Sequence, residues 1–96
     1  MTGKQKRYLR KLAHPLKPLV NIGRQGLSPE NKREIEVQLM EHELIKLKVL
    51  DSCSLSKKEC AYELGKIKDL EVVQVIGKTL VLFCPRQDDP GIKLPA

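Results

Sequence analysis

Residues 19–30 read Leu-Val-Asn-Ile-Gly-Arg-Gln-Gly-Leu-Ser-Pro-Glu and join a short apolar run, a glycine loop and a helix start. The loop is Gly23-Arg24-Gln25-Gly26. Two glycines allow the backbone to turn with positive φ and to approach a ligand closely, and Arg24 adds a forked donor. Ser-Pro-Glu at residues 28–30 starts a helix whose first turn directs unpaired N–H groups the same way. The stretch therefore predicts an anion-binding loop between a strand and a helix.

Positive charge is concentrated beside this loop. Residues 1–26 carry seven basic and no acidic side chains, whereas the other 11 basic and 12 acidic residues leave the rest of the chain at −1. Such a stripe is typical of a protein that binds a polyanion, because each neutralised phosphate releases condensed counterions. A solvated helix face is the alternative. The absence of acids and the adjacent loop favour a nucleic acid. The basic residues are Lys4, Lys6, Arg7, Arg10, Lys11, Lys17 and Arg24.

Length and composition predict one small domain over residues 1–96, with residues 86–96 as an extended C-terminal tail. The hydrophobic content of 41% over 96 residues suits a single core. The sequence has neither a membrane-spanning run nor the apolar region of a signal peptide, so we expect a cytoplasmic monomer without a membrane partner. Three cysteines without a C-x-x-C pair predict reduced thiols, at least two of them buried, and no metal site.

Local patterns predict seven elements. Thr2 and Gln5 form a capping box for a helix that ends before Pro15, Ser28 caps a helix over residues 29–42, and Ser56 opens a second capping box. Strands are expected at residues 19–22, 44–49, 72–76 and 79–83, the last two joined by the Gly77-Lys78 turn. In the strand at 44–49, the two lysines alternate with apolar residues. The predicted buried positions of the three helices are Tyr8, Leu9, Leu12, Ala13, Ile35, Leu39, Met40, Cys60, Ala61, Leu64 and Ile67, and the pairs Val73/Leu82 and Val75/Leu80 should face one another in the hairpin.

The order α-β-α-β-α-β-β predicts an α/β (α+β) two-layer sandwich with a mixed four-stranded sheet. If the first three strands are parallel and joined by right-handed crossovers, the second and third helices cover one face. The carboxyl ends of these strands then share one edge, and the glycine loop and Lys78 become neighbours. A first helix antiparallel to the first strand would bring Lys4 and Arg7 to the same edge.

Five segments together carry a resemblance to one known family. They are Thr2-Gly3-Lys4-Gln5, residues 9–13, residues 18–26 with the G-x-x-G loop, His42-Glu43-Leu44-Ile45-Lys46, and residues 75–82. This combination resembles the CRM domain in its stand-alone bacterial form, the YhbY family. The resemblance covers nearly the whole chain. It implies a fold similar to the C-terminal domain of translation initiation factor 3 and binding to RNA. The resemblance also implies an association with precursors of the large ribosomal subunit, as in bacterial members, or with intron splicing, as in plant organelles.

The family's RNA-binding loop maps onto residues 23–26. The sequence departs from the family pattern at Phe83, where tyrosine is common, and at Cys84, where a basic residue is expected before Pro85; an RNA contact from that strand end stays open. We therefore expect an RNA-binding protein for large-subunit ribosomal RNA or its precursor particle, with no cofactor. Its expected RNA-binding residues are Gly23, Arg24, Gln25, Gly26, Lys4, Lys6, Arg7, Arg10, Lys11, Lys17 and Lys78.

Other interpretations are weaker. Gly77-Lys78-Thr79 imitates the end of a P-loop, but Val72 stands where its first glycine is needed and a strand follows instead of a helix. His14, His42 and the Asp88-Asp89 pair lack catalytic partners, so we expect no enzyme. A KH domain places its G-x-x-G loop between two helices, which does not fit. An adaptor that docks the basic patch on an acidic protein remains the alternative function. Aromatic residues make up only 3%, so recognition should depend on RNA backbone and shape.

Overall fold

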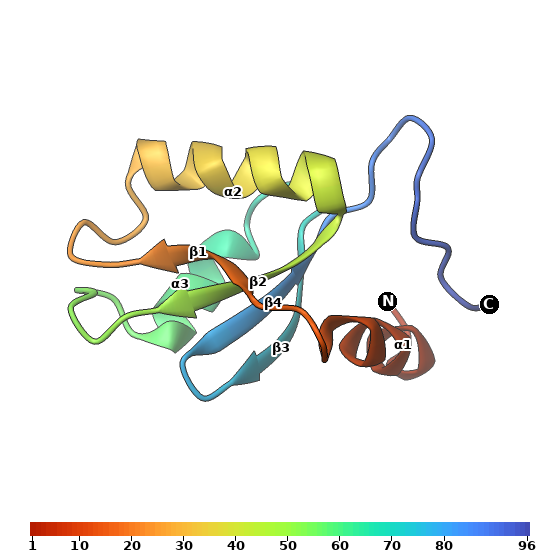
Figure 1. Cartoon of the computed structure of the whole chain (residues 1–96), viewed down its shortest axis with the longest axis horizontal. Coiled ribbons are helices and arrows are strands. Elements are labelled where there is room, and N and C mark those ends of the chain that lie inside the picture. The colour runs from red at the N-terminus through yellow and green to blue at the C-terminus, as the bar shows by residue number, and fades with distance from the viewer.

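A computed structural model describes residues 1–96, and it contains three helices and four strands in the predicted order (Figure 1). The predicted fold class is confirmed, and most element ends agree within one residue. None of the helices is both long and apolar enough to cross a membrane. The elements are α1 (Gly3–Ala13), β1 (Pro18–Ile22), α2 (Pro29–His42), β2 (Leu44–Val49), α3 (Lys57–Leu64), β3 (Glu71–Ile76) and β4 (Thr79–Phe83).

The strands form one mixed sheet in the order β1-β2-β4-β3. β1 and β2 are parallel, and β4 runs antiparallel to both β2 and β3. β3 therefore has the same direction as β1 and β2, as predicted, although β4 separates it from them. The carboxyl ends of these three strands lie at one edge of the sheet, at the left of Figure 1. We call this the loop edge, because it carries residues 23–26, 50–55 and 77–78.

Local capping fixes the helix starts where the sequence places them. Thr2 and Gln5 form a reciprocal capping box, and Ser56 and Glu59 form another. Ser28 accepts the Asn31 N–H at 3.1 Å and Pro29 occupies the first turn of α2. Each cap satisfies donors that a helix start leaves unpaired, so it sets a boundary without help from tertiary packing.

The larger core lies between α2, α3 and one face of the sheet, as predicted. Ile35 and Leu39 of α2 and Cys60 and Leu64 of α3 are buried in it. Met40 is 73% exposed, so its predicted burial is wrong. At 100° per residue, Met40 lies about 140° around the helix from Ile35 and about 100° from Leu39, so it points away from the buried stripe. The cluster is Val20, Ile22, Ile35, Leu39, Ile45, Leu47, Val49, Cys60, Leu64, Leu70, Leu80 and Leu82.

α1 covers only one end of the opposite face. Leu9 and Ala13 are buried there, as predicted, whereas Tyr8 and Leu12 are each 38% exposed. The contacts of α1 lie at the edge opposite the loop edge, because Leu44 begins β2 and Phe83 ends β4. This smaller cluster contains Leu9, Ala13, Leu44, Val73, Val81 and Phe83, with Ile92 and Leu94 of the tail packed against it.

A β-bulge in β3 changes the predicted hairpin pairing. Val75 pairs with Leu80 as expected, but Leu82 pairs with Val72 and the register shifts between Val72 and Gln74. The extra residue, Val73, therefore turns to the α1 side and joins the smaller cluster. The predicted Val73/Leu82 pair is wrong because strict alternation cannot anticipate a bulge.

The tail is fastened to the domain by Glu43, which directly follows α2. Its side chain is 2% exposed, and its carboxylate accepts the N–H groups of Arg86 at 2.8 Å, Gly91 at 2.8 Å and Ile92 at 2.9 Å. Burial raises the pKa of Glu43, but the N–H donors and the Arg86 charge together hold that pKa below its ordinary value. The tail has no helix or strand, yet it is held in place by a buried anion.

Candidate nucleic-acid interface

The G-x-x-G loop is a tight turn closed by a hydrogen bond from the Gly26 N–H to the Gly23 carbonyl at 3.0 Å. Gly26 has a φ of 62°, in the left-handed region that favours glycine, as predicted. Gly23 does not lie in that region, so the expectation that both glycines supply positive φ is wrong for Gly23. A Cβ at Gly23 would meet the Ser52 Oγ at 3.6 Å, which is an ordinary contact. The turn therefore depends on Gly26.

The tip of the loop is open and its base is buried. Arg24 and Gln25 are exposed, and their N–H groups donate to no acceptor within the chain. Gly26 is buried beside Ser54 and Leu55, and its carbonyl accepts the Asn31 side-chain amide at 2.6 Å. The loop is therefore exposed at its tip and covered at Gly26. The arrangement presents two free backbone donors and one guanidinium on a rigid support, which suits a phosphate.

The start of α2 offers fewer donors than predicted. Pro29 has no N–H group, and Ser28 already accepts the Asn31 N–H with its side chain and the Lys32 N–H with its carbonyl. The N–H groups of Ser28 itself and of Glu30 are left without an acceptor in the chain. The helix dipole still points at the loop, but the hydrogen bonds for an anion come mainly from the loop itself.

Three loops meet at the loop edge. The Leu50 N–H donates to the Ile22 carbonyl at 2.9 Å, and the Val49 N–H donates to the Lys78 carbonyl at 2.7 Å. The prediction that Lys78 and the G-x-x-G loop lie at the same edge of the sheet is confirmed. The Lys78 ammonium forms an exposed ion pair with Asp51. The hydrogen bond and the charge of Lys78 lower the pKa of Asp51, which keeps its carboxylate ionised at neutral pH.

The basic face of α1 lies elsewhere. α1 and both chain ends are at the right of Figure 1, far from residues 23–26 along the longest axis of the molecule. The Gln5 side chain donates to the Pro95 carbonyl at 3.1 Å, which ties the start of α1 to the tail. The prediction that α1 brings Lys4 and Arg7 to the loop edge is therefore wrong, because the Leu9 and Ala13 stripe packs at the opposite end of the sheet.

The uncovered part of the sheet face lies between α1 and the loop edge. Asn21, Lys48, Thr79 and Ile76 form one cross-strand row there, since Lys48 pairs with both Asn21 and Thr79, and Thr79 pairs with Ile76. Lys48 is exposed and Ile76 is 54% exposed. In the next row, the Lys46 ammonium donates to the His14 carbonyl at 3.1 Å. We call Asn21, Lys48, Thr79 and Ile76 the open row.

Of the residues predicted to contact RNA, the structure gathers Arg24, Gln25 and Lys78 at the loop edge, with Gly23 and Gly26 shaping the turn. Lys4, Lys6, Arg7, Arg10 and Lys11 belong to α1, and Lys17 lies in the exposed connector before β1. Lys48 is absent from the predicted set. The alternation of residues 44–49 placed Lys48 on the same face as Lys46. The sheet order adds that Lys48 lies beside the loop edge, which makes it a candidate for RNA contact.

The two residues that depart from the family pattern, Phe83 and Cys84, lie at the end of β4. Phe83 is 2% exposed in the smaller core, and the Cys84 N–H donates to the Glu43 carbonyl at 2.8 Å. Cys84 is partly buried, and burial raises the pKa of its thiol. Both residues lie at the edge opposite the loop edge, so their departure from the family pattern does not alter residues 23–26, Lys78 or the open row.

The three thiols are free, and only Cys60 is fully buried. Cys53 and Cys84 are only partly buried, so the expectation of buried thiols is confirmed for Cys60 alone. Burial and the neighbouring Cys53 raise the pKa of Cys60 to about 11. No group of three His, Cys, Asp or Glu side chains is arranged to hold a metal ion.

Known proteins are similar to this chain in sequence, and a solved structure is similar to it in fold. A protein of Bacillus subtilis named "Probable RNA-binding protein YqeI" is 39% identical over 95 residues, covering 99% of each chain. A relative from Methanocaldococcus jannaschii, also named as an RNA-binding protein, is 45% identical over 89 residues, which are 91% of this chain and 66% of the relative. The solution structure of a Staphylococcus aureus protein aligns with a TM-score of 0.78 at 39% identity, covering 99% of both chains.

The family model described as the CRS1/YhbY (CRM) domain matches residues 1–83. This range contains the three helices, the four strands and the loop edge. The chain belongs to the CRS1/YhbY (CRM) domain family.

Proposed function

We propose that this protein binds structured RNA, with the loop edge as the main contact and the open row as its continuation. The observation that carries the proposal is the exposed tip of the G-x-x-G loop. There, Arg24 and Gln25 are exposed, their N–H groups have no acceptor within the chain, and the turn that carries them is closed by the Gly26–Gly23 hydrogen bond. Phosphate groups fit such donors, and the names of the relatives as RNA-binding proteins support RNA as the polyanion.

Recognition by backbone and shape follows from the chemistry of this surface. The loop edge and the open row contain no aromatic side chain on which a base could stack. Arg24, Lys48 and Lys78 supply charge, and Asn21 and Thr79 supply neutral polar groups for phosphate or 2′-hydroxyl oxygens. Such a surface binds folded RNA more readily than a short single-stranded motif.

The target that we propose is large-subunit ribosomal RNA in its cytoplasmic precursor particle. The support is the family resemblance together with a surface suited to folded RNA. α1 adds a second basic region at the other end of the molecule, and Lys17 and Lys46 lie between the two regions. A duplex or a multi-helix junction is large enough to contact both, whereas a short oligonucleotide is not.

A charge-matched pair of variants tests the location of the interface. Arg24→Gln/Lys48→Gln/Lys78→Gln removes three charges at the loop edge and open row. Lys66→Gln/Lys68→Gln/Lys93→Gln removes three exposed charges remote from the loop edge. The first variant should reduce the slope of log affinity against log salt by roughly 2 to 3 for a large-subunit ribosomal RNA fragment, because each phosphate contact contributes about 0.7 to 0.9. Equal slopes for the two variants would contradict the proposed location.

Crosslinking in cells, followed by sequencing of the bound RNA, tests the target. Enrichment of large-subunit over small-subunit ribosomal RNA supports the proposal. Recovery of an acidic protein and no RNA would replace it with the adaptor function.

A further inference from the structure

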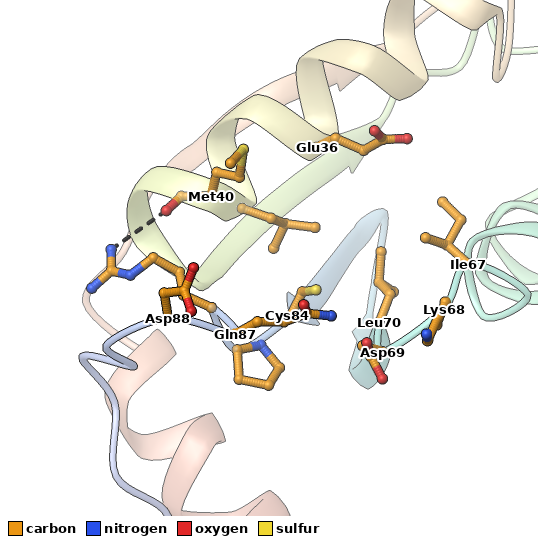
Figure 2. A pocket seen from close by; sticks show the side chains of 12 residues that line it. Glu36, Met40, Ile67, Lys68, Asp69, Leu70, Cys84, Gln87 and Asp88 are labelled. Atoms are coloured by element: carbon orange, nitrogen blue, oxygen red, sulfur yellow. Dashed lines mark hydrogen bonds between the residues drawn. The ribbon is translucent and has the colours of Figure 1, made fainter.

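A groove with a volume of about 520 Å³ lies at the edge of the sheet opposite the loop edge (Figure 2). One wall is the second half of α2, with Glu36 and Met40. The other wall is the connector between α3 and β3, with Ile67, Asp69 and Leu70, and residues 84–88 close the end. Nothing in the proposed RNA contact uses this groove.

The floor of the groove is apolar. Leu39 and Leu70 are buried at its base, and Ile67 and Cys84 are only partly covered. Met40 stands on the rim with 73% of its surface exposed, although it is a large apolar residue. Methionine adapts its shape to different partners and is frequent at recognition surfaces. The groove therefore has an apolar floor, and Met40 gives one of its walls a flexible apolar side chain.

The rim of the groove carries three carboxylates that form no ion pair within the chain. They belong to Glu36, Asp69 and Asp88. Lys68 is the one basic rim residue without an internal partner. The Arg86 guanidinium is already engaged: it donates to the carbonyls of Met40 at 3.4 Å and Glu41 at 3.2 Å, and it lies 3.9 Å from the Glu43 carboxylate.

This sign is opposite to that of the RNA-binding surface. The chain has a net charge of +6, yet the groove has three free carboxylates against one free ammonium. Phosphates are repelled here, whereas a positively charged segment is attracted. An apolar floor with a charged rim is the usual anatomy of a protein-docking site.

We propose that the groove docks a basic protein segment, one that inserts an apolar side chain between α2 and residues 67–70 while its lysines or arginines face Glu36, Asp69 and Asp88. The site is separate from the RNA contact, so one molecule can hold RNA at the loop edge and a basic protein at the groove. The chemistry of the partner is therefore that of a basic segment with one or two large apolar residues.

Three synthetic peptides of equal length test this proposal. The first has two leucines among lysines, the second replaces the leucines with serine, and the third replaces the lysines with glutamate. Each is titrated into the ¹⁵N-labelled full chain, and amide shifts are followed by NMR. The first peptide should shift residues 36–40, 67–70 and 84–88, and each of the other two should bind at least fivefold more weakly. Equal binding of the first two peptides, or no binding at millimolar concentration, would overturn the proposal.

Two matched pairs of variants locate the site. Glu36→Lys should weaken the first peptide at least fivefold, whereas Glu34→Lys, an exposed change of equal charge on the same helix and outside the groove, should change binding less than twofold. Met40→Ser should weaken binding about threefold, whereas Val37→Ser, at a 48% exposed position outside the groove, should not. The same loss in both members of a pair would mean that the peptide does not occupy the groove.

Two further measurements decide between occupants. Adding the ribosomal RNA fragment should shift residues 23–26 and leave the groove unshifted; shifts confined to the groove would identify RNA as its ligand and refute the proposal. Groove shifts that grow with protein concentration alone would identify a second copy of this chain as the occupant and would also refute it. Failure of RNA to bind anywhere would contradict the proposed function but leave the peptide result standing.

Discussion

The two edges of the sheet use backbone N–H groups in opposite ways. At one edge, three N–H groups from residues 86, 91 and 92 surround the carboxylate of Glu43, which is 2% exposed. At the other edge, the N–H groups of Arg24 and Gln25 are exposed and have no internal acceptor. N–H groups that bind an internal carboxylate therefore stabilise the fold, whereas N–H groups without an internal acceptor are available to an external anion.

Glu43→Gln tests whether the buried carboxylate holds the tail. It should lower the free energy of unfolding by about 3 kcal/mol. A carboxamide has one acceptor oxygen, so its NH₂ group must face at least one N–H donor in a buried place. Urea unfolding measures the change, and faster exchange of the Gly91 and Ile92 amides should show that the tail is released.

The control is Glu41→Gln, which removes an exposed charge near the same helix end and should change stability by less than about 0.5 kcal/mol. A loss below about 1 kcal/mol for Glu43→Gln would mean that the tail is held by Ile92 and Leu94 rather than by the carboxylate.

Acid should have the same effect as the substitution. The pKa of Glu43 lies below its ordinary value of 4.5 in the folded chain, so the unfolded chain takes up the proton first. The stability that Glu43 contributes is therefore full above that ordinary value and is lost as the pH falls through the lower folded pKa. Urea unfolding from pH 7 to pH 3 should show the wild type and Glu43→Gln converging in acid. A gap independent of pH would contradict this assignment.

The sequence predicted most of the fold because its signals are local. Capping boxes at Thr2 and Ser56, Pro29 at a helix start and the alternation of residues 44–49 each depend on neighbours within a few residues. The same applies to the Gly77-Lys78 turn, where Gly77 has a φ of 55°. These signals fixed the order of elements and, through the handedness of crossovers, the shared loop edge.

What the sequence could not predict depends on contacts between distant residues. Glu43 looked like one more charged residue of a family segment, because its partners lie 43 to 49 positions later. The place of α1 depends on Leu44 and Phe83, which close the smaller core far from the loop edge. The placement of residues 23–26 and Lys78 at one edge was accordingly predicted correctly and the direction of α1 wrongly, while the contact of these residues with RNA stays a prediction.

Substitutions at the two loop glycines test which of them the turn requires, because only Gly26 has a positive φ. Gly26→Ala should cost about 1 to 2 kcal/mol of stability, from the left-handed backbone and a contact of 3.4 Å between the new Cβ and the Ser54 Oγ. Gly23→Ala should cost less than about 1 kcal/mol and serves as the matched control. Thermal unfolding of both variants checks the difference, and equal losses would contradict it.

Gly26→Asp must be compared with Gly26→Ala, since both carry the strain and only the aspartate adds charge. The aspartate should weaken RNA binding at least tenfold relative to the alanine, measured below the unfolding temperature of each. Equal binding of these two variants would show that no phosphate approaches the loop.

The basic face of α1 provides the next contrast. Lys4→Gln/Arg7→Gln/Lys11→Gln should weaken the binding of a long ribosomal RNA fragment about tenfold, or roughly 1.4 kcal/mol, and flatten its salt dependence. It should hardly affect an RNA hairpin too short to reach from the loop edge to α1. Unfolding should be nearly unchanged, because these side chains are exposed. An unchanged salt slope with the long fragment would show that this face is only solvated.

The smallest expected effect is a gain. Asp51 pairs with Lys78 at the loop edge and places a negative charge where phosphates should bind. Asp51→Asn frees the Lys78 ammonium, so RNA affinity should rise about two- to threefold at moderate salt and the gain should shrink as salt increases. Stability should change by less than about 0.5 kcal/mol, since both side chains are exposed. In Lys78→Gln, the same Asp51→Asn change removes repulsion but releases no ammonium, so its benefit should be smaller. An equal benefit in both backgrounds would mean that Asp51 acts only through its own charge and that Lys78 does not contact the RNA.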